Sequence, residues 1–486
     1  MKQLVFLCSL VLCGCAVGPD FYAPAVPDTQ TYTHKAESSR TVSAGGIEGS
    51  SQTFTAPDTP LPMWWRQFHS AELDRLVEQA LNQSPTLAQA RAKLIEAREN
   101  YNAQSGVTRF PSVDAKISGT RQQVDLAAFG IPNVENPGPF SLFNASLMVS
   151  YTFDVFGGNR RALEATLAQV DYEAFQLDAA RLSIAGNVVS TAVQRASLQQ
   201  QVLLTQRLAD AQAQQLGIME ARFAAGGVSQ LDVNSQRTLL AQTRASLPPL
   251  STQLAQADHQ LAILVGDVPS KADFDQLTLD SLHLPAEIPV TLPSTLARQR
   301  PDIRASEALL HQASANVGVA TANLYPQFSL SAGIGSERTS IQDVVKGLNI
   351  WNIGLNLTQP IFHGGELHAR KRATQAAYDA AFASYQQTVL QALQQVADAL
   401  TALHNDAHEL HARDDAARQA QANLEIARAQ YSAGGVSQFS LLDTQRQALQ
   451  TALDQTHAQA ARLSDTAALF QSLGSSQADL TLGSAP

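Results

Sequence analysis

The sequence contains few cysteines, aromatic residues and charges. Only 3 of its 486 residues are cysteine, while aromatic residues make up 6% and charged residues 16%. Cys8 and Cys13 lie in the expected N-terminal leader and Cys15 directly follows it in a modification motif, so the mature chain would keep no free thiol for a disulfide, a metal or a nucleophile. With little bulky material for a thick core, the chain suits long helices that pack closely through small side chains.

The sequence also lacks an excess of positive charge, catalytic motifs and long apolar runs. The formal net charge is −10, which argues against a nucleic-acid partner because phosphate binding needs a basic surface. We find no glycine-rich phosphate loop and no Ser-His-Asp arrangement with supporting context, so we expect neither an enzyme nor a bound cofactor. The apolar run "LVFLCSLVL" near the N-terminus is too short to span a bilayer.

The first residues have the pattern of an export signal. Lys2 supplies a positive start, the apolar run follows, and "LCGC" ends at Cys15, which resembles a bacterial lipobox. Cleavage before Cys15 would leave its thiol to carry a covalent lipid. By resemblance to bacterial sorting rules, Ala16 next to it favours the outer membrane. The alternative is an ordinary signal peptide with an incidental cysteine.

The chain is an internal duplication. "AGGVSQ" occurs at 225–230 and again at 433–438, and each copy follows a long run whose apolar spacing is typical of coiled-coil-like helices. The first run, about 65 residues, predicts a rod of roughly 100 Å. We expect the next helix to break or kink at Pro248 and Pro249, and a single helix over about 294–324 in the second repeat.

Each repeat also contains two segments in which apolar and polar residues alternate, the period of a two-faced strand. About ten residues are enough for such a strand to cross a bilayer. A sheet edge cannot stay unpaired in lipid, so the sheet must close. Four strands cannot close, and the small polar inner faces favour three or more copies around a wet lumen. The helices are too polar for lipid and must continue the barrel into water.

These patterns divide the chain into six parts. They are a signal peptide at 1–14, a lipidated arm at 15–69 without much structure of its own, a first repeat at 70–265, a connector at 266–293, a second repeat at 294–473 and a disordered tail at 474–486. The expected strands are 112–121 and 145–155, then 326–336 and 350–360, and the tips are 225–229 and 433–437. The Trp-containing stretch 62–68 is expected to pack the arm onto the body.

Several short motifs, in their order, resemble the TolC-like outer-membrane efflux factor family, in the lipoprotein branch typified by OprM and NodT. "GCAVGPD" resembles the mature start of that branch, and "RQRPDIRASEALLHQASANVGVATANLYPQFSL" resembles its signature. "FDVFGG" and "TQPIFHGG" resemble its two strand-to-helix turns. Each motif alone is weak, whereas their order across almost the whole chain is specific.

The resemblance implies a fold that is mainly α with a transmembrane β-barrel. A homotrimer would form a twelve-stranded barrel in the outer-membrane lipid of a Gram-negative bacterium, continued by a twelve-helix periplasmic α-barrel. The implied function is a passive duct that exports drugs or toxic compounds, with a periplasmic membrane-fusion adaptor and an RND-type inner-membrane transporter as partners. Alternatives are a same-fold duct for type I peptide or protein secretion or for metal efflux, a periplasmic coiled-coil scaffold or adaptor, and a lipid-anchored envelope enzyme.

The resemblance also implies a periplasmic gate just after the tips. Val436 and Ser440 stand where TolC has an Arg and an additional Asp, so its salt-bridge network is incomplete here. Closure would then depend on rings of Phe439 and Asp443. The alternatives are acidic residues that only favour a helix start and a Phe439 that packs at an interface. The gate candidates are Asp232, Tyr431, Phe439 and Asp443.

Two further groups of residues are candidates for binding. The tips suit an adaptor, since a repeating partner would meet the same surface twice, although a Gly pair is also an ordinary helix stop. Three histidines spaced i, i+4, i+7 are a weak metal candidate, and a solvated helix face is the simpler interpretation. The tip residues are Gly226, Gly227, Val228, Ser229, Gly434, Gly435, Val436 and Ser437, and the histidines are His404, His408 and His411.

Overall fold

The computed structural model describes residues 16–26, 29–34, 39–46, 49–55, 63–130, 135–271 and 273–474. The expected signal peptide, Cys15 and almost all of the expected tail lie outside them. The chain forms two compact units. The first comprises Met1–Pro24, Lys93–Glu173 and Ser306–Tyr385, and the second comprises Ala25–Ala92, Ala174–Ala305 and Gln386–Pro486.

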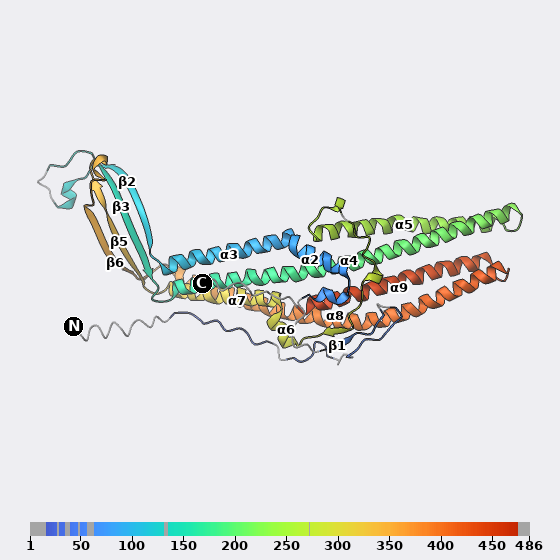
Figure 1. The fold of residues 1–486 in the computed structure, drawn as a ribbon. Coiled ribbons are helices and arrows are strands. Elements are labelled where there is room, and N and C mark those ends of the chain that lie inside the picture. Colours follow the sequence, from blue (N-terminus) through green and yellow to red (C-terminus); the bar gives the residue numbers. More distant parts are fainter. Residues whose placement is uncertain are drawn as a thin grey trace. The chain divides into compact units, whose positions relative to one another are not determined.

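The first unit carries an antiparallel four-stranded sheet (Figure 1). Its order is β2-β3-β5-β6, and Val149 of β3 pairs with Val113 of β2 on one side and with Ala332 of β5 on the other. The two-faced strands predicted from alternation are therefore confirmed. The strands are β2 (Ser112–Gln122), β3 (Phe140–Phe153), β5 (Gln327–Arg338) and β6 (Ile350–Thr358).

The start of one strand differs from the expectation, whereas the exposed apolar face agrees with it. β3 begins at Phe140 rather than near 145, because residues 140–144 continue the ladder with residues 118–122 of β2. One face of the sheet is apolar and open: Ile117 is 86% exposed, Trp351 76% and Ile353 68%. Contiguous apolar surface of this kind marks a membrane or protein contact.

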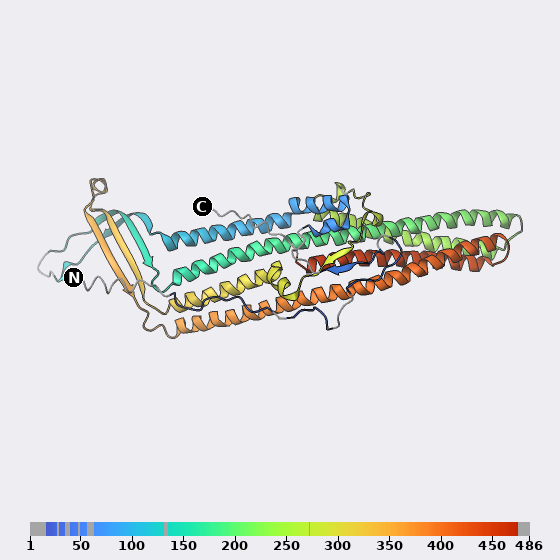
Figure 2. The same ribbon diagram turned by 60° about the horizontal axis from the view of Figure 1, so that its bottom comes forward.

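The helices repeat in length as well as in order. α4 (Gly158–Ala224) and α8 (Glu366–Ser432) have 67 residues each, and α5 (Gln230–Leu264) and α9 (Gln438–Ser472) have 35 each. In the second unit, α9 lies alongside the end of α8 (Figures 1 and 2). These equal lengths confirm the duplication that the repeated tip indicated.

Of the break or kink expected at Pro248 and Pro249, the break is wrong, because α5 continues through both residues. Both prolines lie on the exposed side of the helix. Water can therefore satisfy the carbonyls that lose their intrahelical donors. Among the described residues, no helix combines the length and the apolar character needed to cross a bilayer.

The single helix expected over 294–324 is also wrong, since α6 (Pro293–Gln299) and α7 (Pro301–Ala322) are separate. Arg300 between them is extended, with ψ of 126°, because a proline disfavours helical geometry in the residue before it. The first repeat has the same division at Ser84, between α2 (Ala71–Gln83) and α3 (Pro85–Arg109).

The arm is more structured than the sequence indicated. β1 (Thr53–Thr55) pairs in parallel with β4 (Glu287–Pro289) of the connector. The predicted packing of the Trp stretch is confirmed: in η1 (Trp64–Phe68), Trp64 is fully buried and stacks on Phe470 of α9 with ring centroids 5.6 Å apart. The connector also contains η3 (Pro269–Lys271) and η4 (Leu279–Ser281).

Candidate functional site: the two hairpin tips

Both predicted tips are helix ends with the same backbone. Gly226 and Gly434 have φ of 77° and 78°, in the left-handed region that glycine adopts without a steric cost. The N–H groups of Gly227 and Gly435 each donate to a carbonyl one helical turn back, at 2.8 Å in both tips. This geometry satisfies the last carbonyls of α4 and α8, so the repeated sequence builds the same turn twice.

The helices that leave the tips begin differently. Ser229 and Asp232 form a capping box: the Asp232 N–H donates to Ser229 Oγ at 3.2 Å, and the Ser229 N–H donates to the Asp232 carboxylate at 3.0 Å. Hydrogen bonds from the Ser229 side chain and backbone hold the pKa of Asp232 below its usual range. In the second tip Ser437 Oγ accepts from the Ser440 N–H at 3.2 Å, and a serine stands where the first tip has its carboxylate.

The structure places all four gate candidates within one or two helical turns of a tip. Phe439 is 79% exposed. Asp443 pairs with Arg446 on its own helix at 2.5 Å, where both side chains are exposed. Tyr431 lies under the Arg222 guanidinium, 5.9 Å from the ring centroid, a cation–π distance. Within one chain, therefore, the two acidic candidates are each bonded locally.

Contacts between the two hairpins were not predicted. Gln438 Nε2 donates to Gln236 Oε1 at 3.1 Å, and Gln236 Nε2 donates to the Gln212 carbonyl at 3.0 Å. Gln236 and Gln212 are fully buried. The last residue of the repeated hexapeptide is exposed as Gln230 and buried as Gln438, and the identical sequences of the two copies do not show this difference. Leu231, 74% exposed at the position equivalent to Phe439, was also missed, although aligning the two copies of the tip would reveal it.

The residues after Cys15 dock on the first unit. The Val17 N–H donates to the Phe156 carbonyl at 3.0 Å, beside the turn between β3 and α4. Asp20 pairs with the buried Arg161 at 2.6 Å, and a side chain on Gly18 would come within 2.5 Å of the backbone of Gly318. The chain therefore approaches the strand-to-helix turn closely just after the lipidation candidate.

The geometry does not support the metal alternative at the three histidines. The rings of His404 and His408 meet edge to face with centroids 5.0 Å apart, and His411 Nδ1 lies 3.0 Å from the Ser43 carbonyl. Across the part of the chain that the structure describes, no group of three or more His, Cys, Asp or Glu side chains is arranged to hold a metal ion.

Known proteins match this architecture along almost its whole length. A sequence model of the outer membrane efflux protein family matches residues 76–267 and 292–475. The chain belongs to this family. The pyoverdine export outer membrane protein OpmQ of Pseudomonas putida is 31% identical over 419 residues, which cover 85% of this chain and 88% of that protein. The toluene efflux pump outer membrane protein TtgI of P. putida is 28% identical over 482 residues, covering 97% and 98%.

Solved structures agree with the sequence relatives. The outer-membrane channel OprN superposes with a TM-score of 0.82 at 28% identity, covering 95% of this chain and 99% of that one. As a member of the outer membrane efflux protein family, the chain is an efflux-channel component of the Gram-negative outer membrane, with a periplasmic helical tunnel. The family consists of channel proteins, and the expectation that this chain catalyses no reaction stays a prediction.

Proposed function

We propose that three copies of this chain form a passive outer-membrane duct through which a tripartite pump exports small, drug-like or toxic compounds. The observation that carries the proposal is the four-stranded sheet of the first unit. In the described residues, its end strands β2 and β6 each pair with one neighbour only, while apolar side chains such as Ile117 and Trp351 are open. Lipid on that face requires a closed sheet, and three copies supply twelve strands.

Several properties of the chain support export rather than another use. The relatives are named for pyoverdine export and for toluene, solvent and antibiotic efflux, which supports small organic compounds as cargo. The exposed, near-identical tips suit a periplasmic membrane-fusion adaptor that repeats around the duct. The resemblance to the lipoprotein branch supports an RND-type inner-membrane transporter, and a covalent lipid on Cys15 would anchor the arm.

The proposed gate is tested by conductance. Phe439 is open and Asp443 is held only by an exposed ion pair, so both side chains are available to meet their copies in a trimer. We expect purified protein in planar bilayers to open rarely, and Asp443→Ala and Phe439→Ala to raise its conductance. Glu96→Ala, which removes an exposed carboxylate on α3 outside the helices that meet at the tips, is the matched control. Conductance equal to wild type in both gate variants would contradict the gate, and a protein that forms no channel at all would contradict the duct.

A further inference from the structure

Part of the arm crosses α8 and α9 in the second unit, and a buried arginine holds it there. This part, residues 39–46 and 49–55, is called the arm strap below. Arg462 of α9 is fully buried, and its Nη2 donates to the Ser50 carbonyl at 2.6 Å and to Thr41 Oγ1 at 3.1 Å. Gln52, also fully buried, donates to Thr466 Oγ1 at 3.3 Å. The arm strap is thus attached to α9 through two fully buried side chains, Arg462 and Gln52.

Two carboxyl groups lie beside this arginine. Asp406 of α8 hydrogen-bonds to Asp465 of α9, and Arg462 attracts Asp406. One oxygen of Asp406, Oδ2, is buried and accepts no hydrogen bond from a donor group in the described part of the chain. A hydrogen bond between two carboxyl groups requires that one of them carry a proton, because two adjacent carboxylates repel. The pair therefore joins α8 to α9 only while it holds that proton.

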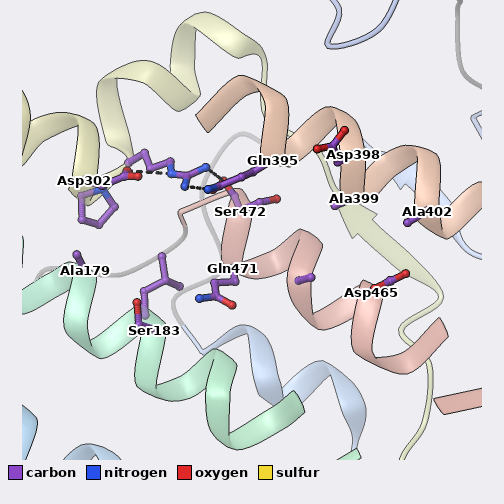
Figure 3. A pocket seen from close by; sticks show the side chains of 14 residues that line it. Ala179, Ser183, Asp302, Gln395, Asp398, Ala399, Ala402, Asp465, Gln471 and Ser472 are labelled. Atoms are coloured by element: carbon purple, nitrogen blue, oxygen red, sulfur yellow. Dashed lines mark hydrogen bonds and ion pairs between the residues drawn. The ribbon is translucent and has the colours of Figure 1, made fainter. Parts of the chain in front are cut away.

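Asp465 also lines a cavity of about 530 Å³, which gives the pair a route to water (Figure 3). The walls come from α4, the start of α7, α8 and α9, and Asp398 and Gln471 add polar groups to the lining (Figure 3). A polar cavity of this size holds many waters. The shared proton can therefore exchange with solvent although the Arg462 side chain itself is buried.

The charges around the pair set the pH at which the proton leaves. Burial, then the hydrogen bond with Asp465 and its charge, and then Glu409 raise the pKa of Asp406, while Arg462 opposes the rise, and the resulting pKa is about 7. Burial lowers the pKa of Arg462 to about 10, so the arginine stays charged throughout the titration. The other charged groups nearby are Asp398, Asp302 and Arg300 at the cavity, and Arg40, His408 and His411 beside the arm strap.

We propose that Asp406 and Asp465 share one proton and, with Arg462, form a pH-sensitive clasp that holds the arm strap on α8 and α9 and loosens when the proton is lost. With the proton, the pair carries one negative charge that Arg462 balances. Without it, two adjacent carboxylates oppose one cation, and α8 and α9 are pushed apart where the strap crosses them. A raised pKa in the folded state means that the stabilisation is complete below the ordinary Asp value and is lost as the pH rises through about 7.

Hydrogen exchange of the purified full-length protein tests the clasp. The reporters are the Thr41 and Gln52 amides, which donate at 2.9 Å to the Gln52 carbonyl and to Thr41 Oγ1. After correction for the intrinsic pH dependence of exchange, we expect wild-type protection to fall at least about tenfold between about pH 5.5 and about pH 8.5. In Asp406→Asn the amide donates to Asp465 at every pH, so protection should stay high. Protection in Asp465→Asn should likewise stay high at every pH.

Two control variants distinguish the pH dependence of the clasp from that of neighbouring ionisable groups. His411 also contacts the Ser43 carbonyl of the strap, so His411→Gln must keep the wild-type pH slope. Asp398→Asn, which removes a cavity carboxylate outside the pair, must keep it too. Wild-type protection that does not change with pH overturns the proposal, even if a variant fails to fold. A slope that survives in Asp406→Asn, or that disappears in His411→Gln, also overturns it.

Discussion

Three buried arginines attach non-helical segments to helices of the second unit. Arg195 of α4 pairs with Asp258 at 2.9 Å and donates to the Leu277 carbonyl of the connector at 2.9 Å. Arg462 of α9 holds the arm. Arg300, the non-helical residue between α6 and α7, donates to the Ser472 carbonyl at the end of α9. A core poor in aromatic residues gains directional contacts in this way. Because buried guanidinium groups are costly unless all their donors are used, each of the three positions is sensitive to substitution.

Arg300→Ala should loosen the end of α9. The side chain is 7% exposed, donates to the Ser472 carbonyl at 2.9 Å, contacts Gln395, and pairs with Asp302 at 2.9 Å. Its loss leaves buried acceptors unpaired, which should cost about 3 kcal/mol and reduce amide protection in the last turn of α9 about a hundredfold. Arg298→Ala, two residues earlier and exposed, should change protection less than about threefold. Equal protection in the two variants would contradict this role.

Residue positions in the site were easier to predict than residue contacts. The tips could be located from the repeated hexapeptide, and Asp232 and Phe439 from the positions just after it that the family resemblance assigns to a gate. The pairing of Arg222 with Tyr431, and of Asp406 with Asp465, depends on the rotation of each helix about its axis. The apolar stripes on α4 and α8 are broad and rich in alanine, so they leave that rotation open.

At the scale of elements, each tip contains two glycines, of which only the first has a backbone conformation that favours glycine. Gly434 has a positive φ and open space around it, whereas Gly435 has an ordinary φ and would place a side chain 3.5 Å from the nearest backbone oxygen. The first tip has the same arrangement. The two glycines of each pair therefore serve different purposes, although the sequence presents them as equals.

Gly434→Ala should destabilise the second tip and Gly435→Ala should not. Left-handed backbone costs a residue with a side chain roughly 1–2 kcal/mol, so the first variant should open the tip about tenfold more often. Limited proteolysis between α8 and α9 measures that opening directly. Gly435→Ala should be cleaved at nearly the wild-type rate, since a new side chain there makes ordinary contacts. Similar cleavage of both variants would mean that the left-handed turn is not what holds the tip.

Element types could be predicted from the sequence better than element ends. Period and length identified the four strands and the long helices. The errors arose where a proline had two possible effects: Pro248 and Pro249 lie inside α5, while Pro301 begins α7. Solvent exposure decides whether a helix continues through a proline, because water can replace the lost hydrogen bonds on the exposed side of the helix. In a long, weakly amphipathic helix the sequence does not show which turn is exposed, because exposure depends on how the helix packs.

At the scale of the whole molecule, the sheet links the chain to its surroundings. Successive residues of β6 alternate between an apolar face, with Ile353 and Leu355 exposed at 68% and 69%, and a face with Asn352 and Asn356. In a closed barrel one face meets lipid and the other meets the lumen. The assignment of apolar side chains to lipid therefore predicts opposite tolerance to charge on the two faces of the same strand.

Ile353→Arg and Asn356→Arg test that assignment, because they place the same side chain three residues apart on opposite faces of β6. On the lipid side an arginine near the middle of the bilayer should cost about 2–4 kcal/mol per subunit, whereas a lumenal arginine meets water. We expect Ile353→Arg to reduce the amount of assembled, detergent-stable oligomer recovered from outer membranes, and Asn356→Arg to assemble at near wild-type yield. If both variants assembled equally, or if Asn356→Arg were the defective one, the sheet would face the bilayer with its other side and the duct as proposed could not form.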